Sequence, residues 1–520
     1  MKLSYSVENL RRLSSIPMIE IRPLTILLGR NSAGKSTFLR SLPLLRQSIE
    51  TKSSAPILWY GDFVDFGNYR SAVADNDTTK KITFSFEMDE FSQSVRTAAY
   101  LTINGAPQTQ TKNVNYGRVK ALYSVRAGDE GTDRHEIAVK INDIGSELRI
   151  TFGDEGPFAS EIALNGREIK GVFDSRELYF SQSNIFSTPS VFSRNKDKLL
   201  VPETRTEFFR KLVEKELGNL DQRIGKRRIL SESSRILQKR MIDQTTIHEL
   251  AKTDTQTFHH YYLGLLQKWR QNTRQRLDDL CKINHALNVL EALSSSLATM
   301  FRSVEYIGPA RARSERFYRQ QELEVAEISP DGRNLPMFLA SLDRHRLNEF
   351  SNWVERIFGY GVSVHKTEGH ISINLDHGGK SINVLDTGYG VSQVLPVLTQ
   401  IWWMQHPRRP GNRGSSGNKT LLIEQPELHL HPAHQALLAD VFVEALSSKA
   451  GFPISFIVET HSESLVNKIG ELISKKALSK DKVQIVIFGE DDTDSDSQVS
   501  IATFSEDGVL QNWPFGFFNY

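Results

Sequence analysis

Apolar and polar positions alternate along two stretches of the first third of the chain, residues 82–87 and 148–152. A period of two predicts strands that are buried on one face, and glycines such as Gly105 punctuate the segments around them. The pattern therefore predicts an antiparallel β region within residues 41–180. Residues 203–302 differ, because they lack proline and place apolar side chains at helical spacing. They predict a helical insertion.

Three apolar runs elsewhere each end in polar residues. They cover residues 24–28, 420–423 and 454–458, and helical patterns begin near residues 36, 432 and 462. Buried strands that alternate with helices predict an α/β core. Because ligands of open α/β sheets collect at the carboxyl ends of strands, we expect these three strand ends to form one site.

The first run leads into Gly29-Arg-Asn-Ser-Ala-Gly34-Lys35-Ser36, which has the Gly-x4-Gly-Lys-Ser spacing of a phosphate-binding loop. Glycine at both positions allows positive φ, so that backbone N–H groups can turn inward around an anion. The helix that follows directs its positive end at the same phosphates. We therefore predict binding of ATP with Mg²⁺. The nucleotide-binding residues predicted from the loop are Gly29, Asn31, Ser32, Ala33, Gly34, Lys35, Ser36 and Thr37.

A phosphate-loop protein also needs a carboxylate opposite the loop hydroxyl, to hold the Mg²⁺ shell directly or through water. Glu424 ends the run 420–423 and meets this need, so Ser36 and Glu424 are the predicted metal residues. His461 follows the third run and is predicted to lie at the same edge of the sheet.

Composition adds little to this interpretation. The 520 residues carry 64 basic and 62 acidic side chains, and the net charge of +2 neither requires nor excludes nucleic acid. Basic residues do cluster at 226–228 and 238–240, as a solvated face or as a surface for DNA or a partner. Cys281 is the only cysteine, which fits a reducing, cytoplasmic location. No apolar stretch reaches the roughly 18 residues of a membrane span, so we expect no membrane association.

Four further segments resemble motifs of one protein family. Residues 386–396 resemble its signature segment, 424–432 its Walker B motif and D-loop, 459–462 its switch-histidine motif, and 507–518 its short C-terminal domain of unassigned function. With the phosphate loop, they follow the order found in ABC-type ATPase heads of the RecF, SMC and OLD group. The branch that the chain resembles, AAA family ATPases with this short domain, includes PtuA-like anti-phage defence ATPases.

The resemblance implies an α/β fold: an ABC-type P-loop ATPase head with a mixed β-sheet, an antiparallel β lobe and an inserted helical domain. It also implies a homodimer in which each ATP lies between the phosphate loop of one copy and the signature of the other, with higher oligomers open. The residues that would face the nucleotide of the second copy are Gly388, Gly390, Ser392 and Gln393.

One position departs from the family pattern. Gln425 stands where the resemblance places the catalytic Glu, and an amide can hold the attacking water but cannot take its proton. Either another group is then the base, with Glu427 and His461 as the candidates, or turnover is slow. The predicted catalytic residues are Glu424, Gln425, Glu427 and His461.

The predicted domains are an N-terminal ATPase lobe (1–198, ending in a polar linker at 181–198), a helical insertion (199–302), a C-terminal ATPase lobe (303–480) and a short C-terminal domain (481–520). We find no nuclease motif. We therefore expect an ATP-dependent switch or scaffold for a separate effector, such as a nuclease, in anti-phage defence. The alternative is a RecF-like ATPase that binds DNA in repair or maintenance.

Overall fold

The structure is a computed structural model that divides into two compact units, which are described separately. Unit 1 consists of Met1–Glu8, Thr51–Ile57 and Asn68–Ala298, and unit 2 of Asn9–Glu50, Leu58–Gly67 and Thr299–Tyr520. The residues that the structure describes are 2–103, 106–129, 131–154, 156–169, 174, 177–194, 200–218, 226–252, 258–267, 270–321, 325, 327–406, 418–448, 453–489 and 498–513.

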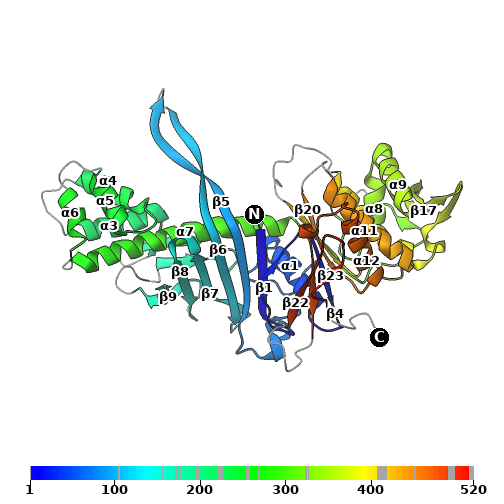
Figure 1. Ribbon diagram of the computed structural model, residues 1–520, viewed down its shortest axis with the longest axis horizontal. Helices are drawn as coiled ribbons and strands as arrows, with labels where there is room; N and C mark the ends of the chain where they lie inside the picture. The colour runs from blue at the N-terminus through cyan, green and yellow to red at the C-terminus, as the bar shows by residue number, and fades with distance from the viewer. Residues whose placement is uncertain are drawn as a thin grey trace. The chain divides into compact units, whose positions relative to one another are not determined.

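Unit 1 is built on an antiparallel sheet with the strand order β10-β9-β8-β7-β6-β5-β1. The strands are β1 (Lys2–Leu10), β5 (Ile82–Ile103), β6 (Ala106–Ala127), β7 (Thr132–Ile141), β8 (Ser146–Phe152), β9 (Ala159–Leu164) and β10 (Arg167–Glu168). The alternation that predicted strands at 82–87 and 148–152 is confirmed, since Phe84 and Phe86 are both fully buried. Figure 1 shows the β5–β6 hairpin extending beyond the other strands of this sheet.

A second, smaller sheet in unit 1 contains β11 (Leu178–Phe180), β12 (Pro189–Arg194) and β13 (Leu200–Glu203). The prediction of a polar linker at 181–198 is therefore wrong for β12, because Val191 is buried and pairs with both neighbouring strands. The helical prediction for 203–302 is confirmed for the part of this range that the structure describes. The helices are α3 (Arg205–Gly218), α4 (Lys226–Leu237), α5 (Gln244–Lys252), α6 (His259–Gly264) and α7 (Gln271–Arg302), with the short α2 (Tyr69–Ala72) near the start of the unit.

Unit 2 contains a seven-stranded sheet with the order β14-β19-β20-β4-β21-β22-β23. Its strands are β4 (Leu24–Gly29), β14 (Val304–Ile307), β19 (Lys419–Glu424), β20 (Ile454–Glu459), β21 (Val483–Phe488), β22 (Val499–Phe504) and β23 (Leu510–Gln511). Pairing is parallel from β14 to β21 and antiparallel beyond. The predicted mixed α/β fold is thus confirmed. The short strands β2 (Leu13–Ser15) and β3 (Ile19–Glu20) precede β4.

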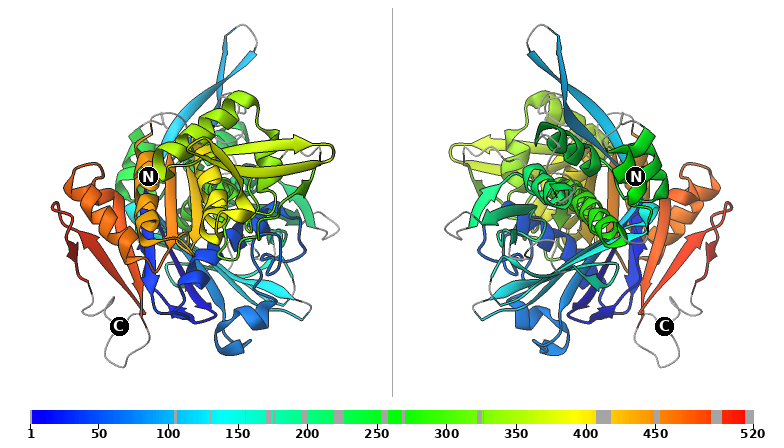
Figure 2. Two further views of the ribbon diagram at one scale, coloured as in Figure 1. Left: turned by 90° about the vertical axis from the view of Figure 1, so that its right-hand side faces the viewer. Right: turned by 90° about the vertical axis from the view of Figure 1, so that its left-hand side faces the viewer.

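Unit 2 contains the helices α1 (Lys35–Glu50), α8 (Leu335–Ser341), α9 (Arg344–Phe358), α10 (Tyr389–Gln405), α11 (Pro432–Ser447) and α12 (Glu463–Ser474). Of these, α1, α10 and α11 pack on the seven-stranded sheet. The β22–β23 hairpin lies beside α12 (Figure 2, left). A small sheet of β15 (Tyr318–Arg319), β16 (Gly361–Thr367), β17 (His370–His377) and β18 (Lys380–Asn383) lies next to α8 and α9 in the chain and in space. The helix break before α9 has a local cause, because Asp343 accepts a hydrogen bond from the Arg346 N–H and caps a new helix.

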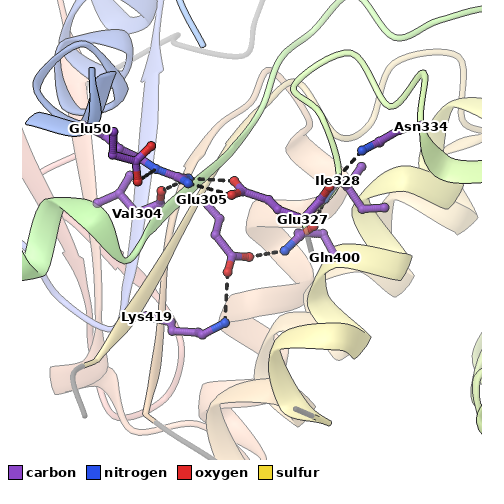
Figure 3. A network of polar contacts seen from close by, with 9 residues as sticks. Glu50, Val304, Glu305, Glu327, Ile328, Asn334, Gln400 and Lys419 are labelled. Atoms are coloured by element: carbon purple, nitrogen blue, oxygen red, sulfur yellow. Dashed lines mark hydrogen bonds and ion pairs between the residues drawn. The ribbon is translucent and has the colours of Figure 1, made fainter. Parts of the chain in front are cut away.

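A polar network connects the sheet edge to α10 inside unit 2 (Figure 3). Glu305 on β14 pairs with Lys419 Nζ at 3.0 Å and accepts a hydrogen bond from Gln400 of α10. Arg46 of α1 forms a two-point ion pair with Glu327 at 2.7 and 2.6 Å. Burial raises the pKa of Glu305, and the charge of Lys419 opposes that rise.

Candidate functional site

The loop between β4 and α1 has the backbone that phosphate binding requires. Gly29 and Gly34 adopt φ values of 143° and 102°, a region that residues with a Cβ rarely enter. Space is also lacking, because a Cβ at Gly29 would lie 2.2 Å from the Phe488 carbonyl oxygen and one at Gly34 would lie 2.5 Å from Leu13 Cδ2. Both glycines are therefore needed for the turn that brings the chain into the helix.

Lys35, the first residue of α1, lies inside this loop. Its ammonium donates hydrogen bonds to the carbonyl oxygens of Gly29 and Arg30 at 2.8 and 2.7 Å, and its side chain is buried. Burial lowers the pKa of Lys35, although the charge of Glu459 opposes this. The cation is thus held at the centre of the loop, where it can meet a phosphate.

A pocket of about 310 Å³ opens beside the loop. It collects most of the nucleotide-binding residues predicted from the loop; Gly29 and Ala33 belong to the loop but are not among the residues that form the wall. The lining residues are Arg11, Arg12, Asn31, Ser32, Gly34, Lys35, Ser36, Thr37, Gln425 and Glu459.

Two cations in this wall, Arg11 and Arg12, were not predicted from the sequence. Arg12 Nη1 donates to the Ser32 carbonyl oxygen at 3.3 Å, while Arg11 stacks over the Phe66 ring at 4.4 Å. With Lys35, they give the pocket three positive charges, which suits a polyanion such as a triphosphate. The sequence signal that could have predicted them is a pair of adjacent arginines directly after a strand.

The Ser36 hydroxyl donates a hydrogen bond of 2.9 Å to Glu459 Oε1. Glu459 is the last residue of β20 and is only 3% exposed. Burial and the charge of Glu424 raise its pKa to about 7, while Ser36 and Lys35 act in the opposite direction. Sequence reasoning missed this carboxylate as a site group, although it ends an apolar strand just as Glu424 does.

Glu424, the predicted metal carboxylate, is engaged elsewhere in this structure. Arg40 donates to both of its oxygens at 2.7 Å, and the Tyr306 hydroxyl donates to Oε1 at 2.7 Å. Burial and the charge of Glu424 raise the pKa of Tyr306, so the phenol stays protonated. Arg311 binds the Glu424 backbone carbonyl at 2.8 Å and holds the end of β19.

The predicted catalytic residues after β19 and β20 lie close together. Gln425 lines the pocket and has a positive φ of 45°. Glu427 is buried and accepts a hydrogen bond of 2.7 Å from the His461 backbone N–H, and burial raises its pKa. The His461 side chain is exposed. Only Gln425 among these three belongs to the pocket wall.

The predicted signature residues lie at the start of α10. Gly388, the residue before the helix, is exposed and has φ 76°, whereas Ser392 and Gln393 are buried. Gly390 allows a close approach, because a Cβ there would lie 2.3 Å from the His429 carbonyl oxygen. The signature helix thus packs directly on the segment that follows β19.

The residues present fit ATP with Mg²⁺. The loop holds a buried ammonium at the N-terminus of α1, and Glu459 Oε2 is buried without a hydrogen-bond partner among the described residues. The described part of the chain contains no cluster of three His, Cys, Asp or Glu side chains that could hold a metal by itself. A divalent cation here would therefore depend on the phosphates for further ligands, as Mg²⁺ does in nucleotide sites.

No described helix is long and apolar enough to cross a bilayer.

Comparisons with known proteins support the nucleotide-binding interpretation. A family model described as an AAA ATPase domain matches residues 1–466. No curated protein matches the chain.

Solved structures add only distant similarity. The chain is similar to the Smc head domain from Pyrococcus furiosus bound to the C-terminal domain of ScpA (12% identity, 96% of each chain covered, TM-score 0.31). It is also similar to the SMC head domain from Thermotoga maritima (9% identity, 97% of this chain and 100% of that chain covered, TM-score 0.33). Residues 514–518 of the segment that resembles a C-terminal domain lie outside the described residues.

Proposed function

Since the chain belongs to the family of AAA ATPase domains, we propose that it binds Mg·ATP in the phosphate-loop pocket and hydrolyses it slowly, as a switch. The observation that carries the proposal is Gln425 in the pocket wall. Its amide can orient water but cannot accept a proton. Slow turnover makes the ATP-bound state long-lived, and a long-lived state suits control of another molecule.

The other candidate bases give this proposal indirect support. Glu427 is directed at the His461 backbone N–H, and neither Glu427 nor His461 is among the residues that line the pocket. Glu424 is held by Arg40 and Tyr306. Glu459, the carboxylate in the wall, contacts Ser36 and so lies on the metal side of the loop.

We further propose that ATP binding joins two copies head to tail and that the closed pair holds or releases a separate effector, such as a nuclease, in anti-phage defence. Gly388 is exposed at the start of α10 and is available to a second copy. The order of motifs along the chain supports the same arrangement. The effector part of the proposal rests on this resemblance.

The experiment that tests the proposal compares ATP binding with ATP hydrolysis in the purified full chain. Binding is measured by calorimetry and turnover by phosphate release, with Lys35→Ala as the blank. We expect tight ATP binding, turnover close to that of the blank, and an ATP-dependent rise in mass by light scattering. Rapid turnover without any partner would contradict the switch, and lack of ATP binding would contradict the whole proposal.

Binding of DNA is the second candidate function, because Arg227 and Arg228 are exposed at the start of α4. The neighbouring basic spot is less available, since Lys239 pairs with Glu249 at 3.0 Å and Arg240 donates to the Asn115 carbonyl oxygen. DNA binding that falls steeply with salt and is lost in Arg227→Ala/Arg228→Ala would favour this role.

A further inference from the structure

We propose that Glu459, and not Glu424, is the carboxylate that faces Mg²⁺ when ATP is bound. The inference rests on the proposed function, because it concerns the same pocket. Glu459 Oε1 accepts the Ser36 hydroxyl at 2.9 Å. Ser36 occupies the position in a phosphate loop whose hydroxyl ligates Mg²⁺, so its hydrogen-bond partner is already next to the cation position.

The order of the strands explains why Glu459 reaches Ser36. In the sheet, β20 lies directly beside β4, and Glu459 pairs with Leu27 just before the loop. β19 lies one strand further away, with Glu424 paired to Glu459. Glu459 is therefore the carboxylate on the strand adjacent to the phosphate loop, and Glu424 is separated from the loop by the width of β20.

The second oxygen of Glu459 points to a ligand. Glu459 Oε2 is buried and has no hydrogen-bond partner among the described residues. A buried carboxylate oxygen without a partner is costly, and native structures satisfy such atoms with a donor, a water or an ion. A hydrated Mg²⁺ next to Ser36 would supply that partner, either directly or through one of its waters.

Both carboxylate oxygens of Glu424, by contrast, already have hydrogen-bond partners. Oε1 accepts from Arg40 Nε and Tyr306, and Oε2 accepts from Arg40 Nη2, all at 2.7 Å. Glu424 is not among the residues that line the pocket, whereas Glu459 is. Use of Glu424 as the metal carboxylate would break a buried two-point ion pair, and use of Glu459 would break only its bond to one hydroxyl.

The test measures how much Mg²⁺ tightens ATP binding. ATP is titrated into the full chain by calorimetry, once with excess Mg²⁺ and once with EDTA, and the ratio of the two affinities is the readout. In Glu459→Gln we expect this ratio to fall by about 10-fold or more, as for other groups that position a metal, while affinity in EDTA is kept. In Glu424→Gln, the matched variant of the competing carboxylate, we expect the natural ratio.

The outcomes separate the possibilities. The inference is overturned if the ratio falls in Glu424→Gln alone, if it falls in both variants, or if it falls in neither. If Glu459 served only as a proton acceptor, Glu459→Gln would lower turnover and leave the ratio unchanged. If Glu459→Gln does not fold, Glu459→Asp decides, because withdrawing the charge by one methylene should lower the ratio and an unchanged ratio overturns the inference. Failure of the natural chain to bind ATP under either condition would instead overturn the proposed function and this inference with it.

Discussion

Arg40 holds Glu424 through two parallel hydrogen bonds of 2.7 Å, from Nε to Oε1 and from Nη2 to Oε2. The Glu424 side chain is almost fully buried, while that of Arg40 is about one-third exposed. The pair therefore fixes the end of β19 next to the nucleotide pocket and keeps a buried charge compensated.

Removing this arginine should be costly. Arg40→Ala leaves a buried carboxylate with Tyr306 as its remaining side-chain donor, and we expect a loss of about 2–3 kcal/mol, below the range for fully buried pairs because Arg40 is partly solvated. Urea unfolding measures it. The control is Arg333→Ala, whose pair with Asp331 is largely exposed and should contribute less than about 1 kcal/mol. Equal effects of the two variants would contradict this account.

Gln425 should limit the rate of hydrolysis. Gln425→Glu places a proton acceptor in the pocket wall, and we expect turnover to rise by about 10-fold or more, measured as phosphate release at saturating ATP. Gln425→Ala tests whether the natural amide contributes at all. If Gln425→Glu does not exceed the natural chain, the amide is not what slows the reaction.

The Glu305–Lys419 pair should show a pH signature. Lys419→Met removes the cation that lowers the pKa of a buried carboxyl, so the folded-state pKa of Glu305 should rise further above its ordinary value of 4.5. In both chains the folded state holds this proton more tightly than the unfolded state, but in Lys419→Met it does so up to a higher pH. The stability deficit of Lys419→Met should therefore grow once the pH passes the raised folded-state pKa of Glu305 in the natural chain.

Urea unfolding of the natural chain and of Lys419→Met at several pH values measures this deficit. The matched comparison is between Glu305→Gln and Glu305→Gln/Lys419→Met. Neither of these chains has a carboxyl at position 305, so the effect of Lys419→Met there should lose its pH-dependent part. A deficit that is independent of pH would argue against a buried charge as its cause.

Two glycines fix the β22–β23 hairpin against α12. A Cβ at Gly470 would lie 2.5 Å from the Gly508 carbonyl oxygen. Alanine normally favours a helix by about 1 kcal/mol over glycine, so a destabilised Gly470→Ala would isolate the clash. We expect a net loss of about 1–3 kcal/mol by thermal unfolding. Gly489→Ala is the control, because nothing lies within 4 Å of a Cβ there.

A half-buried histidine in unit 1, His285, should make stability depend on pH. Burial, with help from the charge of Arg240, lowers the pKa of His285 from 6.5 to about 4. Between these values the unfolded chain binds the extra proton, so stability falls as the pH falls through this window and levels off below about 4. In His285→Leu this part of the loss should vanish in unfolding curves recorded between pH 7 and pH 4. Adding His135→Gln should make stability depend still less on pH in this range, because burial lowers the pKa of His135 to about 4 as well.

Some of this protein could be predicted from local sequence. The phosphate loop depends on residues within a few positions of Gly29, and the positive φ values there need no distant contact to be inferred. Period-two alternation found strands at 82–87 and 148–152 for the same reason. Capping is local in the same way, because the Asp343 side chain starts α9 directly after α8.

The sequence by itself determined which strands end in acids, Glu424 on β19 and Glu459 on β20. Only the tertiary structure decided which of them meets the phosphate loop. Strand order is a non-local property, and it placed β20 beside β4 with Glu459 at Ser36. The same packing brought Arg40 and Tyr306, each more than a hundred residues from Glu424 along the chain, onto that carboxylate. Hydrogen bonds between groups so far apart in sequence arise from burial in a common core, which no local pattern records.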